Sequence, residues 1–207
     1  MERPAETQYP IHDLLRRRWS PRAFSERMVE VDKLHSILEA ARWAPSCFNE
    51  QPWYFLIATK EGPEEFERLL SCLVEGNVAW AKNAPVLMLS VAKLSFSRND
   101  KPNKQSQHDL GLAVENLVIQ AQELGLVTHQ MGGFHADKAR QLFGIPEGFE
   151  PIAAIALGYP GDLNTLSPEL RERELAPRIR KPLERFVFSG HWGQASSLVQ
   201  KQIAERK

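Results

Sequence analysis

The sequence lacks most of the features that place a chain in a membrane or in an oxidising compartment. Its 207 residues include two cysteines, Cys47 and Cys72, which form no CxxC pair and are too few for a disulfide framework. No apolar run reaches the ~18 residues that a membrane helix needs. The polar start from Met1 to Pro10 does not have the pattern of a signal peptide. We therefore expect a cytoplasmic protein with no membrane contact.

An excess of charge of one sign is also missing. The 26 lysines and arginines are balanced by 26 aspartates and glutamates. Nucleic-acid binders normally carry a clear positive excess, so we expect no nucleic-acid partner. A cluster of arginines in this chain is then a local feature.

Several motifs of well-known catalytic sites are absent. There is no G-x-G-x-x-G after a strand, no Walker A sequence and no G-x-S-x-G elbow. The six histidines show no H-E-x-x-H or other metal-binding spacing, so we expect no metal. Nothing marks Cys47 as a nucleophile, and a small filler residue is the better interpretation.

What is present is an ordinary globular composition, with 43% hydrophobic and 25% charged residues. We expect one domain over residues 1–207, with a flexible start at residues 1–10. After Gly161 the chain becomes polar and shows no clear core of its own, so residues 161–207 are expected to form an extended tail. Such a tail either wraps the domain or reaches a partner subunit.

Hydrophobic periodicity predicts a mixed order of helices and strands. The central strands are apolar on both faces, so helices are expected to cover both sides of the sheet. The expected helices are residues 11–18, 32–43, 63–74, 108–124 and 136–143, and the expected strands are residues 53–58, 85–91, 127–131 and 152–157.

Four arginines are concentrated in seven residues near the start of the chain. Arg18, Ser20 and Arg22 share a parity, so they point the same way in an extended stretch, which Pro21 favours. Two guanidinium groups and a hydroxyl on one side suit a phosphate or a carbonyl-rich ring edge. The alternative is a solvated basic helix end that is salt-bridged to nearby glutamates.

A second segment, Pro45 to Pro52, reads as neither helix nor strand. Two prolines bracket small and amide residues directly before a strand. Asn49 and Gln51 each present a donor and an acceptor, which suits the edge of a pyrimidine-like ring. The alternative is an ordinary loop between a helix and a strand.

Two features of the second half of the chain offer further ligand-binding groups. Gly132 and Gly133 follow a short apolar run and precede a helix, so their backbone can approach a ligand closely. Arg178 and Arg180 share a parity and could complete a phosphate pocket. The alternatives are a plain tight turn and a solvated charged tail.

Taken together, these segments resemble the FMN-dependent nitroreductase family. The family pattern R-x-S-x-R/K-x-F is matched by Arg18 to Phe24, and A-P-S-x-x-N-x-Q-P-W is matched at every fixed position by Ala44 to Trp53. The helix pattern G-x-A-x-x-N-L-x-x-x-A-x-x-L-G-L is matched by Gly111 to Leu126. The resemblance runs from about His12 to Trp192.

The resemblance implies an α+β fold, an α/β sandwich in which helices flank a central, mostly antiparallel sheet. It implies an intertwined homodimer with extended C-terminal tails that embrace the partner. It also implies FMN as cofactor and NADH or NADPH as transient electron donor. Hydride would pass through flavin N5 in a ping-pong cycle to a small-molecule acceptor such as a nitroaromatic or a quinone. No catalytic side chain is predicted, because the chemistry belongs to the cofactor.

Other activities stay open. The same fold could carry out reductive dehalogenation or flavin fragmentation. The chain could also be a flavin-binding redox sensor without turnover. A basic-patch interaction module is the most distant alternative.

The resemblance further implies cofactor-binding roles by position. Arg18, Ser20 and Arg22 resemble the residues that hold the phosphate, the ribityl chain and the pyrimidine edge. Gly132 and Gly133 resemble the segment whose backbone N–H faces flavin N5. The other implied residues are Trp19 through its backbone, Pro45, Ser46, Asn49 and Gln51 in a loop often lent by the other subunit, Asn77, Gln130, Met131, and the C-terminal phosphate pair Arg178 and Arg180.

Two positions depart from the pattern of some relatives. Gly132 stands where those relatives have an acidic residue, and Trp80 stands where they have a lysine. The cofactor prediction is unaffected by either difference. The acceptor preference of those relatives is not carried over.

Overall fold

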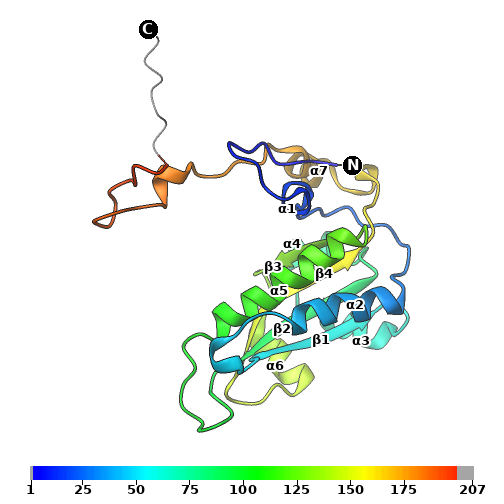
Figure 1. Ribbon diagram of the computed structural model, residues 1–207. Coiled ribbons are helices and arrows are strands. Elements are labelled where there is room, and N and C mark those ends of the chain that lie inside the picture. Colours follow the sequence, from blue (N-terminus) through cyan, green and yellow to red (C-terminus); the bar gives the residue numbers. More distant parts are fainter. Residues whose placement is uncertain (1, 200–207) are drawn as a thin grey trace. The chain divides into compact units, whose positions relative to one another are not determined.

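A computed structural model describes residues 2–199 of the chain (Figure 1). The chain forms two compact units, Met1–Leu175 and Ala176–Lys207. The sheet and all α-helices of the described residues belong to the first unit. The single domain over residues 1–207, the flexible start at 1–10 and the tail from residue 161 stay predictions.

Four antiparallel strands form the sheet, in the order β1-β2-β4-β3. Their bounds are β1 Trp53–Thr59, β2 Val86–Lys93, β3 Val127–Met131 and β4 Phe149–Gly158. Every residue of β2 from Val86 to Ala92 is buried, as its apolar run predicts. The four predicted strands and the antiparallel sheet are confirmed.

Helices lie on both faces of the sheet, which confirms the predicted α+β sandwich (Figure 1). α2 (Val31–Arg42) and α5 (Ser106–Glu123) pack together on one face. α3 (Pro63–Leu70), α4 (Glu75–Ala81) and α6 (Ala136–Phe143) cover the other. Because side chains of a strand alternate between faces, β2 contributes to both cores. Its core residues are Val86, Met88 and Ala92 on the α2–α5 face and Leu87, Leu89 and Val91 on the opposite face.

The helices differ from the sequence prediction in two places. The helix predicted at residues 63–74 ends at Leu70, and the next helix, α4, was not predicted. α4 is anchored by Trp80, which is 1% exposed. α7 (Pro168–Leu175) was not predicted either, because its one buried residue is Glu174 and it has no apolar stripe.

A short helix lies near the start of the first unit, and a 3-10 turn lies in the second. α1 (Asp13–Arg17) precedes the arginine segment and confirms the predicted short helix. The second unit contains a 3-10 turn, η3 (Leu183–Arg185), and the rings of Phe188 and Trp192 lie 5.3 Å apart in it. No helix among residues 2–199 is long and apolar enough to cross a membrane.

Candidate functional site

The segment from Arg18 to Phe24 runs beside the chain that follows β4. Phe24 forms a β-bridge with Pro160, and the Gly161 N–H donates to the Ala23 carbonyl at 2.9 Å. A Cβ at Gly161 would lie 2.4 Å from the Phe24 carbonyl carbon and oxygen, so this crossing requires glycine. The backbone of the arginine segment is therefore fixed at its C-terminal end.

A buried carboxylate holds the same segment from a distant helix. Glu174 Oε1 accepts the backbone N–H of Arg22 at 2.7 Å and that of Ala23 at 3.3 Å. Glu174 Oε2 lies 3.3 Å from Arg22 Nη1, and the Glu174 side chain is 0% exposed. A charge buried this deeply needs such partners. Sequence reasoning missed Glu174, since it lies 152 residues from Arg22 and no motif marks it.

Arg18 and Ser20 lie together at the open end of the segment. Arg18 Nη1 donates to Ser20 Oγ at 3.4 Å, so these two side chains share a side as their parity predicts. Arg18 is half-buried and Ser20 is exposed. Trp19 is half-buried between them in sequence, with the Arg3 guanidinium 5.2 Å from its ring centre.

His129 on β3 connects the arginine segment to the sheet. Its Nδ1 lies 2.9 Å from the Pro21 carbonyl oxygen, and its ring lies 4.5 Å from that of Trp80. Burial lowers the pKa of His129 to about 4, an effect that the Arg22 charge increases and the Pro21 contact opposes. The imidazole is therefore neutral near pH 7, and Nδ1–H donates to the carbonyl.

The chain after β3 turns sharply around Asn77 of α4. Asn77 Nδ2 donates to the Gly133 carbonyl at 2.9 Å, and the Val74 N–H donates to the same oxygen at 3.1 Å. A Cβ at Gly133 would lie 2.8 Å from Asn77 Nδ2, whereas a Cβ at Gly132 would meet nothing within 4 Å. Within residues 2–199 the N–H groups of Gly132 and Gly133 donate to no acceptor.

These contacts connect the segments that carry one group of the predicted cofactor residues, and we call the exposed part of this region around Gly132 the Gly132 surface. The Pro21–His129 contact, the His129–Trp80 ring pair and the Asn77–Gly133 bond connect the arginine segment, β3 and α4. Met131 is buried. The predicted residues on these segments are Arg18, Trp19, Ser20, Arg22, Asn77, Gln130, Met131, Gly132 and Gly133.

The loop that carries Pro45, Ser46, Asn49 and Gln51 lies elsewhere in the subunit. It precedes β1, and β1 and β3 are opposite edges of the sheet with two strands between them. At a spacing of about 4.8 Å per strand, the edges are roughly 14 Å apart. The loop packs instead on α5, where Asp109 Oδ2 accepts the Cys47 N–H at 2.9 Å. Within one subunit this loop and Gly132 therefore follow opposite edges of the sheet.

Arg178 and Arg180 belong to the second unit. Arg180 Nη1 donates to the carbonyl of its neighbour Ile179 at 3.0 Å, and Ile179 is 78% exposed. Arg178 is half-buried. Their part in a phosphate site stays a prediction.

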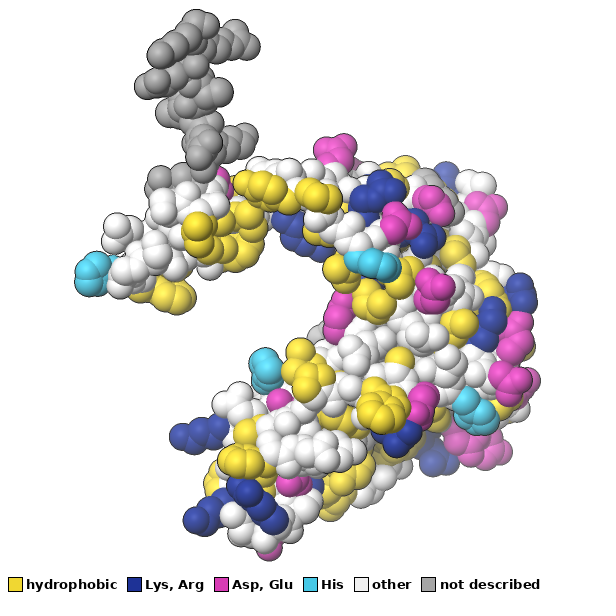
Figure 2. Space-filling model, in the orientation of Figure 1, with side chains coloured by type: hydrophobic (Ala, Val, Ile, Leu, Met, Phe, Trp, Pro, Cys, Tyr) yellow, Lys and Arg dark blue, Asp and Glu magenta, His cyan; other side chains and the backbone are white. Residues whose placement is uncertain are grey.

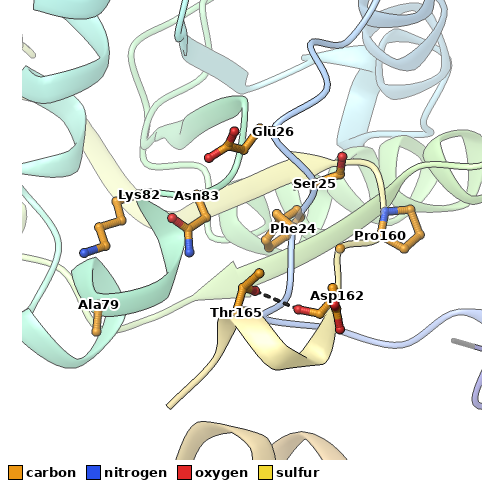
Figure 3. Close-up of a pocket in the computed structure, with 10 residues that line it drawn as sticks. Phe24, Ser25, Glu26, Ala79, Lys82, Asn83, Pro160, Asp162 and Thr165 are labelled. Carbon is orange, nitrogen blue, oxygen red and sulfur yellow. Dashed lines mark hydrogen bonds between the residues drawn. The ribbon is translucent and has the colours of Figure 1, made fainter.

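A hollow of about 540 Å³ opens beside Phe24. Figure 3 shows it bordered by Lys82 and Asn83, which follow α4, and by Asp162 and Thr165, whose hydroxyl donates to the Asp162 carbonyl at 2.7 Å. None of the residues that line it is among the predicted cofactor residues. We therefore do not assign the cofactor to this hollow.

Comparison with known proteins identifies the family. Residues 15–159 match the model of the Nitroreductase family, which covers more than half of the chain. The chain belongs to the nitroreductase family. It is thus an oxidoreductase, and the match includes the arginine segment, the loop before β1 and the end of β3. Arg178 and Arg180 lie beyond the matched residues.

Individual relatives agree with the family. A crystal structure described as an oxidoreductase containing FMN superposes with a TM-score of 0.85 at 38% identity, covering 90% of this chain and 95% of that one. A putative NADH dehydrogenase/NAD(P)H nitroreductase of Archaeoglobus fulgidus is 30% identical over 149 residues, 70% of this chain and 82% of its own. An uncharacterized 15.4 kDa protein of Mycolicibacterium smegmatis is 35% identical over 130 residues, 63% of this chain and 86% of its own.

Proposed function

We propose that this chain is an FMN-dependent NAD(P)H oxidoreductase that reduces small-molecule acceptors such as nitroaromatics and quinones. FMN is the cofactor, and NADH or NADPH is the transient electron donor. When bound, FMN supplies the redox chemistry, a ping-pong hydride transfer through flavin N5. The observation that carries the proposal is the end of β3, where Gly132 and Gly133 offer N–H groups without acceptors among the described residues, beside Asn77.

The groups around Gly132 fit a polar ring edge. Gly132 leaves open space where a side chain would stand, so a flat ligand can approach the backbone. Asn77 uses its amide nitrogen on the Gly133 carbonyl, which leaves its side-chain oxygen to accept a ring N–H. These groups bind and orient a ring; none of them has to move a proton.

The arginine segment fits a phosphate. A guanidinium has five N–H donors, so Arg18 can bind a phosphate while it keeps its contact with Ser20. The Arg22 charge is already balanced by Glu174. We therefore assign the larger part of phosphate binding to Arg18. We assign Arg22, which Glu174 holds in place, to the flavin ring.

A homodimer explains the separation of the two groups of predicted residues. A second copy can place its loop with Pro45, Ser46, Asn49 and Gln51 against the Gly132 surface. β1 is an edge strand on which Tyr54 and Ile57 are 49% and 40% exposed, so it offers a surface for a second chain. We also place the protein in the cytoplasm, where the free thiols of Cys47 and Cys72 stay reduced.

The proposal is tested by the colour and the half-reactions of the purified protein. We expect a yellow protein that releases FMN on denaturation. Anaerobic addition of NADH or NADPH should bleach the flavin, and a nitroaromatic or quinone should restore the colour. If neither nucleotide bleaches the flavin, the reductase proposal is wrong and a redox sensor is favoured. A colourless protein that cannot be reconstituted with FMN would exclude every flavin function.

A further inference from the structure

An exposed aromatic ring lies under a cation in the loop before β1. Phe48 is 72% exposed, and the Arg98 guanidinium lies 4.1 Å from the centre of its ring. Phe96 meets Phe48 edge to face, with ring centres 5.9 Å apart, and lies 5.2 Å from Arg98. We call Phe48, Phe96 and Arg98 the Phe48 platform. A guanidinium this close to a ring is held by a cation–π attraction.

The backbone under the platform is strained. Phe48, Asn49 and Gln51 have φ angles of 54°, 55° and 54°, although none is glycine. Left-handed backbone brings Cβ too close to the following carbonyl oxygen, and among these residues only Asn tolerates it readily. Such strain persists where the surrounding structure holds it, and it is frequent at ligand clamps. The loop therefore presents the Phe48 ring on a backbone conformation that phenylalanine does not prefer.

Three hydrogen bonds hold this loop, one within it and two from other segments. Buried Asp109 of α5 accepts the Cys47 N–H at 2.9 Å, and Ser46 Oγ accepts the Gln51 N–H at 3.0 Å. On the other side, the Ser97 N–H donates to Glu50 at 2.7 Å. The last bond joins the strained loop to the segment that carries Phe96 and Arg98. The platform is thus built from two segments that are fastened to each other.

The surroundings of the platform are positively charged. The hydrogen bond from Ser97 lowers the pKa of the Glu50 carboxyl, and the charges of Lys93 and Arg98 lower it further. Within residues 2–199 Arg98 forms no ion pair. The segment after β2 lies at the bottom of Figure 1, and the same part of Figure 2 shows Lys and Arg side chains beside hydrophobic ones. The basic residues of the segment are Lys93, Arg98, Lys101 and Lys104, and the acidic ones nearby are Glu50, Asp100 and buried Asp109.

We propose that the Phe48 platform selects the acceptor, favouring planar aromatic compounds that carry a carboxylate. Phe48 offers an exposed ring for stacking, and the Arg98 fork offers paired N–H donors for a carboxylate. The inference rests on the proposed function, in which this loop borders the Gly132 surface of a second copy. Phe48 lies between Ser46 and Asn49, the residues assigned to that border. The platform binds and orients the acceptor, and the electrons come from NADH or NADPH.

Two matched acceptors test the inference in the FMN-loaded protein. 4-Nitrobenzoate and 4-nitrobenzamide have the same shape and differ in charge. We expect kcat/KM to favour the carboxylate by about tenfold, the usual scale of a charge-assisted contact. Arg98→Gln should bring the ratio of the two kcat/KM values to about one. Lys101→Gln is the control: it removes a positive charge from the same segment but leaves Arg98 over the Phe48 ring, so the ratio should stay. Phe48→Leu should lower kcat/KM for both acceptors and also reduce the ratio, because it removes the ring that holds Arg98.

A binding measurement separates selection from turnover. Calorimetric titration with benzoate and benzamide, which are not reduced, should show the same preference in the wild type and its loss in Arg98→Gln. Bleaching of the flavin by NADH or NADPH should be unchanged in Lys101→Gln, which lies outside the platform. If the wild type does not prefer the carboxylate, or if Arg98→Gln retains the preference, the inference is wrong while the proposed function stands. A wild-type flavin that neither nucleotide bleaches contradicts the proposed function itself.

Discussion

Glu174 and Arg22 are joined by two contacts, a 2.7 Å hydrogen bond from the Arg22 backbone and a 3.3 Å ion pair with its side chain. The pair connects the last helix of the first unit to the segment that we assign to the cofactor. One residue therefore orients Arg22 and fixes its backbone. Because the Glu174 side chain is 0% exposed, the contacts are made away from bulk water.

Glu174→Gln is expected to destabilise the apoprotein by about 3 kcal/mol, because it leaves the half-buried Arg22 charge unpaired. Urea unfolding followed by circular dichroism measures this. Glu172→Gln is the matched control, since Glu172 is exposed on the same helix and should change stability by less than about 0.5 kcal/mol. Equal stabilities of the two variants would show that the pair contributes nothing.

The two adjacent glycines should respond differently to alanine. At Gly133 the new methyl group would lie 2.8 Å from Asn77 Nδ2 and 3.0 Å from Val74 Cγ2, so Asn77 must move. At Gly132 it would meet nothing within 4 Å. We expect Gly132→Ala to keep the wild-type stability within about 0.5 kcal/mol and Gly133→Ala to lose more. Thermal unfolding of both apoproteins decides, and a less stable Gly132→Ala would contradict the geometry described for the turn.

His129 predicts a loss of stability in acid. Its pKa is about 4 in the folded protein and near 6.5 when unfolded, so the unfolded chain binds the proton more tightly between these values. The contribution is complete above about pH 6.5 and is lost as the pH falls toward 4, by about 3 kcal/mol in total. Urea unfolding across this range measures it. In His129→Gln, which keeps a donor for the Pro21 carbonyl, this part of the pH dependence should vanish; parallel curves would refute the assignment.

Subunit complementation tests the shared site. We expect Arg18→Ala and Asn49→Ala homodimers each to bind FMN weakly. The two variants are co-expressed with different tags and purified as a mixed dimer. One of its two sites then combines the wild-type Arg18 of one subunit with the wild-type Asn49 of the other, so we expect one tight site. FMN fluorescence titration counts the sites. If each site were built within one subunit, the mixed dimer would recover none, and a holoprotein that sediments as a monomer would exclude the shared site outright.

The sequence predicted the sheet well and the contacts of the site poorly. The strands are continuous apolar runs, and α5 has a long apolar stripe, so periodicity is sufficient to find them. α4 contains Gly76 and Asn77, which favour helix weakly, and it is stabilised by the burial of Trp80. That burial is a tertiary effect, which a local pattern does not report.

The site residues show the same limit. The parity of Arg18 and Ser20 predicted correctly that they lie together. The partners that position the site are Glu174 and Asp109, two buried carboxylates with ordinary sequence surroundings. Hydrophobic patterns assign acidic residues to the surface, so both were missed. A buried charge becomes visible only when the distant donors that satisfy it are known.

The residues that hold the arginine segment, residues 159–161 and Glu174, are synthesised late. Residues 22–25 contact residues 159–161 and Glu174, so this wall of the site cannot close until most of the first unit has left the ribosome. The sheet, whose last strand ends at Gly158, can form earlier. A nascent chain can therefore form its sheet before Glu174 is available to hold the segment that we assign to phosphate binding.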